Sequence, residues 1–379
     1  MKERASILVT GATGFIGTRL IQFLAERGGK IRALTRRAKP DSPVAVDHRP
    51  SPWRTPNVEL VRGDITDRDS LARAMDGCDY VFHLAGYAKN WAPTPSTYHD
   101  INVQGAKNVF DLALEQGVER VVWTSSIATF GPTPPGMVAD ETFRRKKKTP
   151  CATEYERSKL EAEHEAIPYL AKGLPLVIVN PTRVYGPGLL TEGNSLSRLI
   201  DDYDRGRLPF LLNRGVNVGN YVTVDDVARG HILAMERGRI GHKYILGGEN
   251  ASLLELLRTI DQVSGRRHFQ IPLLKYGPKV FAWLLQKRAQ WFGIYPPITP
   301  GWIDTFCTEW AYRCDKAQTE LGYEPTPLRT GIERTYLWLL DIRRRNAEAA
   351  RLRRAIRRGR RRARRLLPGL PSGRVANRG

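Results

Sequence analysis

The sequence predicts an α/β protein built on a doubly wound parallel sheet, and three observations support this fold class. An apolar strand at 7–9 runs into the glycine-rich segment TGATGFIG at 10–17, followed by a helical pattern that ends at Gly28. A second strand at 30–35 completes a β-α-β unit. Further strand candidates, separated by helical or loop segments, follow at 58–61, 80–84, 121–124 and 176–179.

The alternation weakens beyond Pro187, which divides the chain. We expect a dinucleotide-binding Rossmann domain over 1–187 to which 219–246 returns, a smaller mixed substrate-binding region over 188–218 and 247–340, and an Arg-rich tail over 341–379. The stretch 273–300 is rich in Trp and Leu. We predict a core helix of the small region there, and the alternative is a hydrophobic lid or a membrane-contacting surface.

Composition excludes several classes of protein. The 379 residues are 41% hydrophobic and 9% aromatic, which is enough for a sizeable core. The sequence contains no run of 18 apolar residues, so no membrane-spanning helix is predicted. The cysteines form no CxxC pair and no His cluster, which argues against a disulfide framework and against a metal site. The first residues lack signal-peptide features, so we expect a cytoplasmic protein.

The net charge of +21 is mainly a property of the tail. Residues 342–379 hold 15 Arg and one acid, a balance of +14, which leaves +7 for the rest of the chain. Apolar residues recur along the tail at Leu352, Ile356 and Ala363, a narrow stripe on a polycationic helix. Three interpretations stay open: peripheral contact with an anionic membrane, binding of nucleic acid, which is less favoured, or a disordered tail.

The glycine-rich segment has the strand before it and the helix after it that dinucleotide binding requires. Gly11 permits the tight turn, Gly14 lets the backbone approach a pyrophosphate, and Gly17 allows close helix packing. Phosphates are expected at the helix N-terminus, where free N–H groups favour anions. The residues assigned to this cofactor loop are Thr10, Gly11, Thr13, Gly14, Phe15, Ile16 and Gly17.

The end of the second strand decides which cofactor is preferred. An acidic residue there would hold the ribose 2′-hydroxyl of NAD. The sequence has Arg36 and Arg37 instead, two guanidinium groups that can bind a 2′-phosphate, so NADP(H) is predicted and NAD is the alternative. Asp64 and Ile65, after the third strand, are placed to meet the adenine end.

A second constellation is formed by Tyr155 and Lys159, four residues apart on one helix face. A nearby ammonium is expected to lower the pKa of the phenol, and the lysine can also hold the nicotinamide ribose. Ser126 ends an upstream strand at the carboxyl edge of the sheet, where ligands bind. Serine, tyrosine and lysine would then form a proton-transfer triad beside the cofactor.

The chain resembles the extended short-chain dehydrogenase/reductase family, in its dihydroflavonol-4-reductase-like and 3β-hydroxysteroid dehydrogenase-like branch, over about 5–340. The motifs that carry the resemblance are TGATGFIG at 10–17, GDIT at 63–66, HLAG at 83–86, INVQGAKNV at 101–109, WTSSIATFG at 123–131, YERSK at 155–159, NPTRVYGPG at 180–188 and NYVTVDDVARGH at 220–231.

The resemblance implies roles for individual residues. Tyr155 would be the acid/base, Lys159 its activator and ribose ligand, and Ser126, rather than Ser125, the hydrogen-bond donor to the substrate. Asn102 would be structural, with a proton-relay water as the alternative. The resemblance also implies a homodimer and places further cofactor contacts at Leu84, Ala85, Gly86, Pro181 and Val184.

One departure from the related nucleotide-sugar enzymes bears on the substrate. Those enzymes usually carry Arg, which grips the sugar-nucleotide diphosphate, where this chain has Gly219. The sequence therefore predicts an NADP-dependent ketone reductase or alcohol dehydrogenase for a lipophilic, steroid-, terpenoid- or flavonoid-like substrate. A nucleotide-sugar epimerase or dehydratase, and a non-catalytic cofactor- or RNA-binding scaffold, are the alternatives.

Two reactive side chains near these motifs are predicted to take no part in the chemistry. His83 ends a sheet strand without metal partners, which is typical of a packed structural histidine. Cys151 has no adjacent base in the sequence that would make it a nucleophile.

Overall fold

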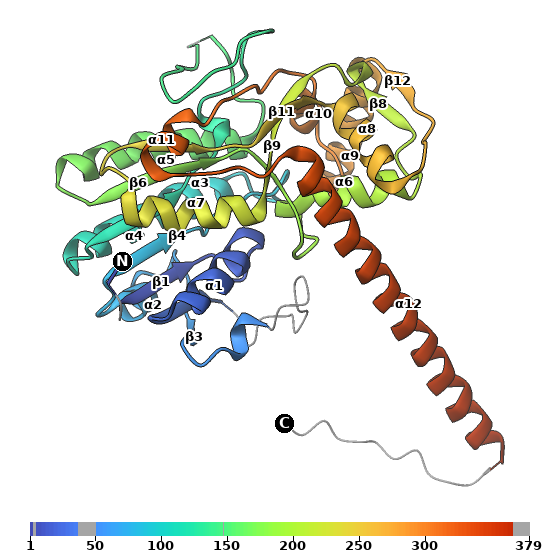
Figure 1. The fold of residues 1–379 in the computed structure, drawn as a ribbon, viewed down its shortest axis with the longest axis horizontal. Coiled ribbons are helices and arrows are strands. Elements are labelled where there is room, and N and C mark those ends of the chain that lie inside the picture. The colour runs from blue at the N-terminus through green and yellow to red at the C-terminus, as the bar shows by residue number, and fades with distance from the viewer. Residues whose placement is uncertain (3–4, 37–50, 147, 367–379) are drawn as a thin grey trace. The chain divides into compact units, whose positions relative to one another are not determined.

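The computed structural model describes residues 1–2, 5–36, 51–146 and 148–366, with side chains up to Arg351. The chain forms two compact units, Met1–Tyr336 and a second that begins at Leu337. Figure 1 shows the ribbon coloured from the N-terminus to the C-terminus.

The centre of the first unit is a seven-stranded sheet in the order β10-β6-β5-β4-β1-β2-β3, in which every neighbouring pair is parallel. Its strands are β1 (Ser6–Thr10), β2 (Lys30–Thr35), β3 (Val58–Arg62), β4 (Tyr80–His83), β5 (Arg120–Thr124), β6 (Leu176–Pro181) and β10 (Lys243–Leu246). The doubly wound parallel sheet predicted from the sequence is confirmed, and its first six strands lie where the apolar runs placed them. Their carboxyl ends form one edge, where the loops of the site begin.

Helices cover both faces of this sheet (Figure 1). They are α1 (Phe15–Arg27), α2 (Arg68–Met75), α3 (Ser96–His99), α4 (Gly105–Glu115), α5 (Glu154–Ala171), α7 (Val224–Arg237) and α11 (Asp315–Leu321). Side chains alternate along β1 as a strand requires: Ile7 and Val9 pack in the core with α1 and α7, whereas Leu8 packs with α2, α4 and α5. This alternation produces two separate hydrophobic cores.

A smaller mixed region sits at the carboxyl edge of the sheet. It contains a sheet of order β11-β9-β7 and a pair β12-β8. Its elements are β7 (Arg183–Tyr185), α6 (Ser195–Asp204), β8 (Phe210–Leu212), β9 (Val218–Thr223), β11 (Glu249–Ser252), α8 (Leu253–Ser264), β12 (Ile271–Leu273), α9 (Tyr276–Phe292) and α10 (Pro300–Phe306).

The helix predicted within 273–300 exists as α9, but the prediction that it is a core helix is wrong. Only Ala282 and Ala289 of its 17 residues are buried. Trp291 and Phe292 are 75% and 70% exposed. Apolar composition indicates what could be buried, but only the neighbouring elements decide what is covered.

The last helix, α12, spans Leu328–Leu366. Its first turns belong to the first unit, where Leu328, Ile332 and Tyr336 are buried. From Leu337 the helix continues as the second unit and carries the Arg-rich stretch as far as Leu366, while 367–379 lie outside the described residues. Among the described residues, no helix combines the length and apolarity needed to cross a bilayer.

Candidate active site

The loop between β1 and α1 has the geometry of an anion site. Gly11 adopts φ +66°, a left-handed conformation that favours glycine. A Cβ on Gly17 would lie 2.2 Å from the Gly11 carbonyl oxygen, so the helix packs on the loop only because residue 17 has no side chain. Gly14 caps α1 without a side-chain hydrogen bond, and the first turn holds no acidic residue. The backbone N–H groups in the first turn of α1 therefore suit the phosphates of a dinucleotide.

The neighbouring Thr10 has a supporting role. Its hydroxyl lies 2.7 Å from His83 Nδ1 and accepts a hydrogen bond from the Ala85 amide at 3.1 Å, which ties the end of β1 to the end of β4. Burial first, and the charge of Lys159 second, lower the pKa of His83 to about 3. His83 is therefore neutral and packed, as predicted for a structural histidine.

At the end of β2, the Arg36 side chain is 75% exposed, with its Nη1 4.0 Å from Asp64 Oδ2. Ile65 is buried and packs against Gly105 at the start of α4. Of the predicted adenine-end contacts, Arg36 and Asp64 are thus accessible to a ligand, whereas Ile65 offers mainly its backbone. Arg37 lies outside the described residues.

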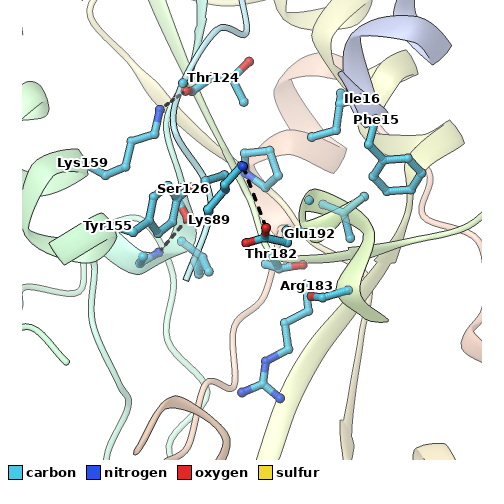
Figure 2. Close-up of a pocket in the computed structure, with 18 of the residues that line it drawn as sticks. Phe15, Ile16, Lys89, Thr124, Ser126, Tyr155, Lys159, Thr182, Arg183 and Glu192 are labelled. Atoms are coloured by element: carbon cyan, nitrogen blue, oxygen red, sulfur yellow. Dashed lines mark hydrogen bonds and ion pairs between the residues drawn. The ribbon is translucent and has the colours of Figure 1, made fainter. Parts of the chain in front are cut away.

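One cavity of about 500 Å³ brings most of the predicted residues together (Figure 2). Those that line it are Gly11, Gly14, Phe15, Ile16, Gly17, Leu84, Gly86, Ser126, Tyr155, Lys159, Pro181 and Val184. Thr10, Thr13, Arg36, Asp64, Ile65 and Ala85 do not line it. The cavity therefore joins the glycine loop to the predicted proton-transfer triad.

The side chains of Ser126 and Tyr155 contact each other in the wall of the cavity. Thr153 caps α5 by accepting a hydrogen bond from the Glu156 amide, which fixes the first turn that carries Tyr155. Burial raises the pKa of the Tyr155 phenol, and a hydrogen bond with Ser126 lowers it by less. The sequence predicted that Lys159 lowers the pKa of Tyr155. In the structure, the loss of water around the phenol is the larger effect, and the pKa is raised.

Lys159 is buried one helical turn after Tyr155. Its Nζ donates to the Thr124 carbonyl oxygen at 2.9 Å and lies 5.6 Å from the centroid of the Trp123 ring. Burial lowers its pKa to about 8, although the negative charge of Glu163 raises it in part. The ammonium is thus oriented by the end of β5, and it remains largely charged at pH 7.

The two serines at the end of β5 have different surroundings. Ser125 is 3% exposed and donates its hydroxyl to Glu163, which also accepts from Asn180 Nδ2 at 2.8 Å. Ser126 is half-buried and contacts the phenol of Tyr155. The geometry favours Ser126 over Ser125 as the donor to a substrate. Sequence reasoning missed Glu163, although its spacing of four from Lys159 on the same helix face was a usable signal.

Two other polar contacts hold the walls of the cavity in place. Asn102 accepts from the Tyr87 amide at 2.6 Å and donates to Ser158 at 2.8 Å, so it fixes the loop after β4, which matches its structural interpretation. Arg145, from the basic run before α5, pairs with the buried Glu156 at 2.6 Å. Sequence reasoning missed Arg145, because no local pattern connects it with α5.

Cys151 has none of the features of an activated nucleophile. It is half-buried just before α5, and burial raises the pKa of its thiol. A raised pKa reduces the fraction present as thiolate, the reactive form. This agrees with the prediction that Cys151 takes no catalytic part.

A further wall of the cavity comes from α10 and from the segment that follows it. Trp302, Phe306 and Trp310 line it, and the rings of Trp302 and Phe306 lie 4.2 Å apart. The sequence carried no signal that would place these aromatic residues in the same cavity as the triad. The cavity therefore combines the polar side chains of the triad with aromatic side chains from a distant part of the chain.

Arg183 corrects the prediction drawn from Gly219. The sequence indicated that a cation is lost at this place, but a Cβ on Gly219 would lie only 2.4 Å from Nη1 of Arg183. The guanidinium of Arg183 reaches over Gly219 from β7, which pairs with β9, and it lines the cavity. The cavity therefore has a cation beside Gly219, supplied by a different strand.

Comparisons with known proteins agree with this geometry. Residues 7–247 match the NAD dependent epimerase/dehydratase family. The chain is 32% identical over 334 residues to a putative dihydroflavonol 4-reductase of Synechocystis sp., covering 87% of this chain and 93% of the relative. It is 29% identical over 341 residues to sterol demethylase protein B of Methylococcus capsulatus, covering 88% and 98%.

A solved structure extends the similarity to three dimensions. The crystal structure of gox2253 has a TM-score of 0.74 and 36% sequence identity, and the match covers 90% of this chain and 98% of that chain. With the family match over residues 7–247, this accounts for both the sheet and the glycine loop. The chain therefore belongs to the NAD dependent epimerase/dehydratase family, within the extended short-chain dehydrogenases/reductases, and is an enzyme of oxidoreductase type.

Proposed function

We propose that this protein is an NADP-dependent ketone reductase or alcohol dehydrogenase that acts on a lipophilic substrate. The observation that carries the proposal is the cavity that joins the glycine loop, the triad of Ser126, Tyr155 and Lys159, and an aromatic wall. Such a cavity has room for a nicotinamide beside a ring compound or alkyl chain. NADPH, when bound, supplies the hydride that reduces the carbonyl carbon.

Each residue of the triad has a task in the reduction. Ser126 donates a hydrogen bond to the carbonyl oxygen of the substrate. Tyr155 transfers its phenolic proton to that oxygen as the carbonyl group is reduced, so that the product is an alcohol. Because burial raises the pKa of Tyr155, the phenol carries its proton at neutral pH, as an acid must. Lys159 would hold the ribose hydroxyls of the cofactor, and its positive charge would stabilise the phenolate that remains.

The aromatic wall supports a lipophilic substrate. Trp302, Phe306 and Trp310 offer rings to the cavity rather than hydrogen-bonding groups suited to a sugar. The names of two relatives refer to a dihydroflavonol and to a sterol, which adds to this support. Purified protein should therefore oxidise NADPH in the presence of steroid, terpenoid or flavonoid ketones. A panel that includes nucleotide sugars, followed at 340 nm, tests the proposal.

Nucleotide-sugar epimerisation or dehydration is the second candidate, and Arg183 is the observation that favours it. A guanidinium in the cavity could grip a diphosphate as the arginine of the related enzymes does. The two candidates differ in their cofactor balance, because an epimerase or dehydratase regenerates its cofactor in each cycle. Conversion of UDP-glucose or dTDP-glucose without net change in NADPH would select the second candidate.

We expect Arg36→Ala to weaken NADPH binding and to leave NADH binding unchanged. The exposed guanidinium at the end of β2 is positioned to meet a 2′-phosphate, which NADH lacks. Loss of one charge-assisted contact, about 1.5–3 kcal/mol, predicts a roughly tenfold to hundredfold higher Kd for NADPH. Fluorescence titration of the variant with both cofactors measures the two constants.

Arg73→Ala is the matched control for Arg36→Ala. Arg73 is an exposed arginine on α2, so the variant makes the same change in net charge away from the end of β2. Its NADPH affinity should equal that of the wild type. If the wild-type protein binds NADH more tightly than NADPH, the preference for NADP proposed here is wrong.

The homodimer implied by the family resemblance stays a prediction. In the resemblance, the contact runs through two long helices, one of which carries Tyr155 and Lys159. That helix is α5 in this chain, and it packs beside α4. Sedimentation velocity of the purified protein measures whether it is a dimer.

A further inference from the structure

Arg183 is a charged residue of the cavity that the proposed reduction does not use. It is half-buried on β7, and its register partner on β9 is Tyr221. Residues two apart on a strand share a face, so the Arg183 side chain runs along the face of β9 that carries Tyr221 and Gly219. The missing side chain at Gly219 leaves the space that the guanidinium occupies.

Aromatic rings and a carbonyl group hold this guanidinium in place. Its Cζ lies 4.5 Å from the centroid of Phe306 and 5.7 Å from that of Tyr221. Nη2 donates to the Thr305 carbonyl oxygen at 3.1 Å, and Nη1 donates to the Tyr221 hydroxyl at 3.4 Å. A guanidinium has five N–H donors, so these two bonds leave three for a ligand.

No carboxylate within the described part of the chain lies at ion-pair distance from Arg183. Lys89, another cation of the cavity, does have such a partner, because its Nζ lies 4.0 Å from Oε1 of Glu192 (Figure 2). A half-buried cation that is oriented by rings but has no anionic partner is a ready site for a ligand's negative charge. Figure 2 places Arg183 at the end of the view away from Lys159 and Thr124.

We propose that Arg183 binds an anionic group of the substrate, a carboxylate or a phosphate, while the apolar body of the substrate lies along Phe306 and Trp302. This inference rests on the proposed function, since it assumes that the cavity holds the substrate. The substrate would then be an amphipathic carbonyl compound with an acid group at the end away from Lys159. The proposal also explains why a glycine at 219 and an arginine at 183 occur together.

The test compares ligands that differ only in their charged end. Decanoate, decyl phosphate and decan-1-ol share one alkyl chain, and their affinities for the NADPH-bound protein are measured by calorimetry at pH 7. We expect the wild type to bind one of the two anions at least roughly tenfold more tightly than the alcohol. The anion that binds more tightly, decanoate or decyl phosphate, indicates whether the site prefers a carboxylate or a phosphate.

Two variants separate an anion site from a structural arginine. Arg183→Met removes the charge, and Gly219→Ala keeps it but places a methyl group 2.4 Å from the present position of Nη1, so that the guanidinium must move. Both should abolish the preference for the anion while the affinity for NADPH and the thermal midpoint stay near those of the wild type. Arg183→Lys should retain part of the preference, because a point charge remains.

Three results would overturn this proposal: no preference for either anion in the wild type, binding of none of the three ligands, or an unchanged preference in Arg183→Met. Its failure is distinguishable from failure of the proposed function. NADPH oxidation by the wild-type protein with an uncharged ketone reports on the reductase alone, because such a substrate carries no anionic group for Arg183.

A different observation carries a second inference, and it concerns the outside of the molecule. The α9 surface is the set of large apolar side chains that α9 leaves at least half exposed: Tyr276, Val280, Phe281, Trp283, Leu284, Trp291 and Phe292. Soluble proteins rarely leave so many aromatic side chains exposed on one helix unless it binds a partner.

Charge indicates the kind of partner. The segment 265–303, which contains α9, holds six Lys and Arg residues and no Asp or Glu. Two of the six are paired with acids outside the segment, Lys279 with Asp304 and Arg266 with Asp204, and the surface stays net basic. Lys287 lies 5.9 Å from the ring of Trp283, and Lys275 lies 5.5 Å from the ring of Tyr276, so cations border the aromatic groups. A second copy docked on this surface would bring like charges together. An apolar partner with negative charge fits better.

We infer that the α9 surface docks on a membrane that contains anionic lipid. Aromatic side chains would enter the boundary between headgroups and acyl chains while lysine and arginine meet the headgroups. Helix α9 packs on α10, which carries Trp302 and Phe306 of the cavity wall. A lipophilic substrate could therefore pass from the bilayer to the cavity along apolar side chains.

Vesicle cosedimentation tests the docking inference with the full chain. Wild-type protein should pellet with vesicles of phosphatidylcholine and phosphatidylglycerol, less with phosphatidylcholine alone, and less at high salt. Trp291→Ser combined with Phe292→Ser should lower the partition roughly tenfold or more. The matched control replaces Val138 and Ile240, which are 49% and 54% exposed and lie outside α9, with serine.

Equal pelleting of the wild type and the Trp291/Phe292 variant would overturn the inference. The inference would also be wrong if the Trp291/Phe292 variant lost self-association, measured by sedimentation velocity, and kept its binding to vesicles. A chain truncated after Asp341 separates the α9 surface from the Arg-rich tail, for which membrane contact was also predicted. If truncation alone abolishes pelleting, the tail and not the α9 surface is the anchor.

Discussion

Tyr155→Phe lowers turnover by roughly a hundredfold to ten-thousandfold, the usual contribution of a positioned general acid, and leaves the affinity for NADPH nearly unchanged. The phenol is held against Ser126 at the cavity wall, and removal of its hydroxyl takes away the proton that the alkoxide must receive. The measurement is kcat on a ketone substrate, with the Kd of NADPH determined by fluorescence titration on the same preparation.

Two companion variants make this result specific. Tyr169→Phe changes a buried tyrosine on the same helix, outside the cavity, and should leave kcat unchanged. Lys159→Ala should damage both turnover and NADPH binding, because Lys159 is expected to hold the ribose as well as to stabilise the phenolate. Full activity of Tyr155→Phe on an identified substrate would show that this triad does not perform the reaction.

Gly11→Ala is expected to abolish NADPH binding and to destabilise the fold. A Cβ at this position would lie 2.6 Å from the Ala85 amide nitrogen and 2.6 Å from the Leu84 carbonyl carbon, both backbone atoms that cannot rotate away. The left-handed backbone costs about 1–2 kcal/mol for a non-glycine residue, and overpacking costs about 1–3 kcal/mol more. Urea unfolding and NADPH titration measure the two effects.

Gly77→Ala is the matched control, because Gly77 has φ +67° against +66° for Gly11. Nothing lies within 4 Å of a Cβ built on Gly77, so this variant carries the backbone cost without the clash. We expect a loss of about 1–2 kcal/mol and normal NADPH binding for Gly77→Ala. Equal stability and equal NADPH affinity of the two variants would contradict the close packing of the cofactor loop.

The sequence predicted the parts of the site that local spacing encodes. Tyr155 and Lys159 share a helix face because four residues make about one turn, and Ser126 follows the end of strand β5 by two residues. Gly11 and Gly17 could be read in the same way, since their turn lies within a single β-α unit. The pKa of Tyr155 was not predictable, because it depends on how much water the surrounding chain excludes.

The parts that were missed come together from distant segments. Trp302 and Phe306 lie more than a hundred residues from Tyr155, and no sequence periodicity predicts that α10 lines the same cavity as α5. The sequence showed the loss of a cation at Gly219, but not its replacement by Arg183. That exchange depends on the pairing of β7 with β9, which sets Arg183 opposite Tyr221 and above the glycine.

The amino-acid sequence by itself determined the parallel α/β sheet, the cofactor loop and the Tyr-Lys helix, because each follows from residues within a few turns or strands of one another. The tertiary structure alone decided that α9 lies uncovered, that Arg183 fills the space over Gly219, and that aromatic residues of α10 line the cavity of the triad. The physical reason is that burial and charge pairing depend on which distant elements pack together. An apolar or basic pattern within one segment does not show which other segments will contact it.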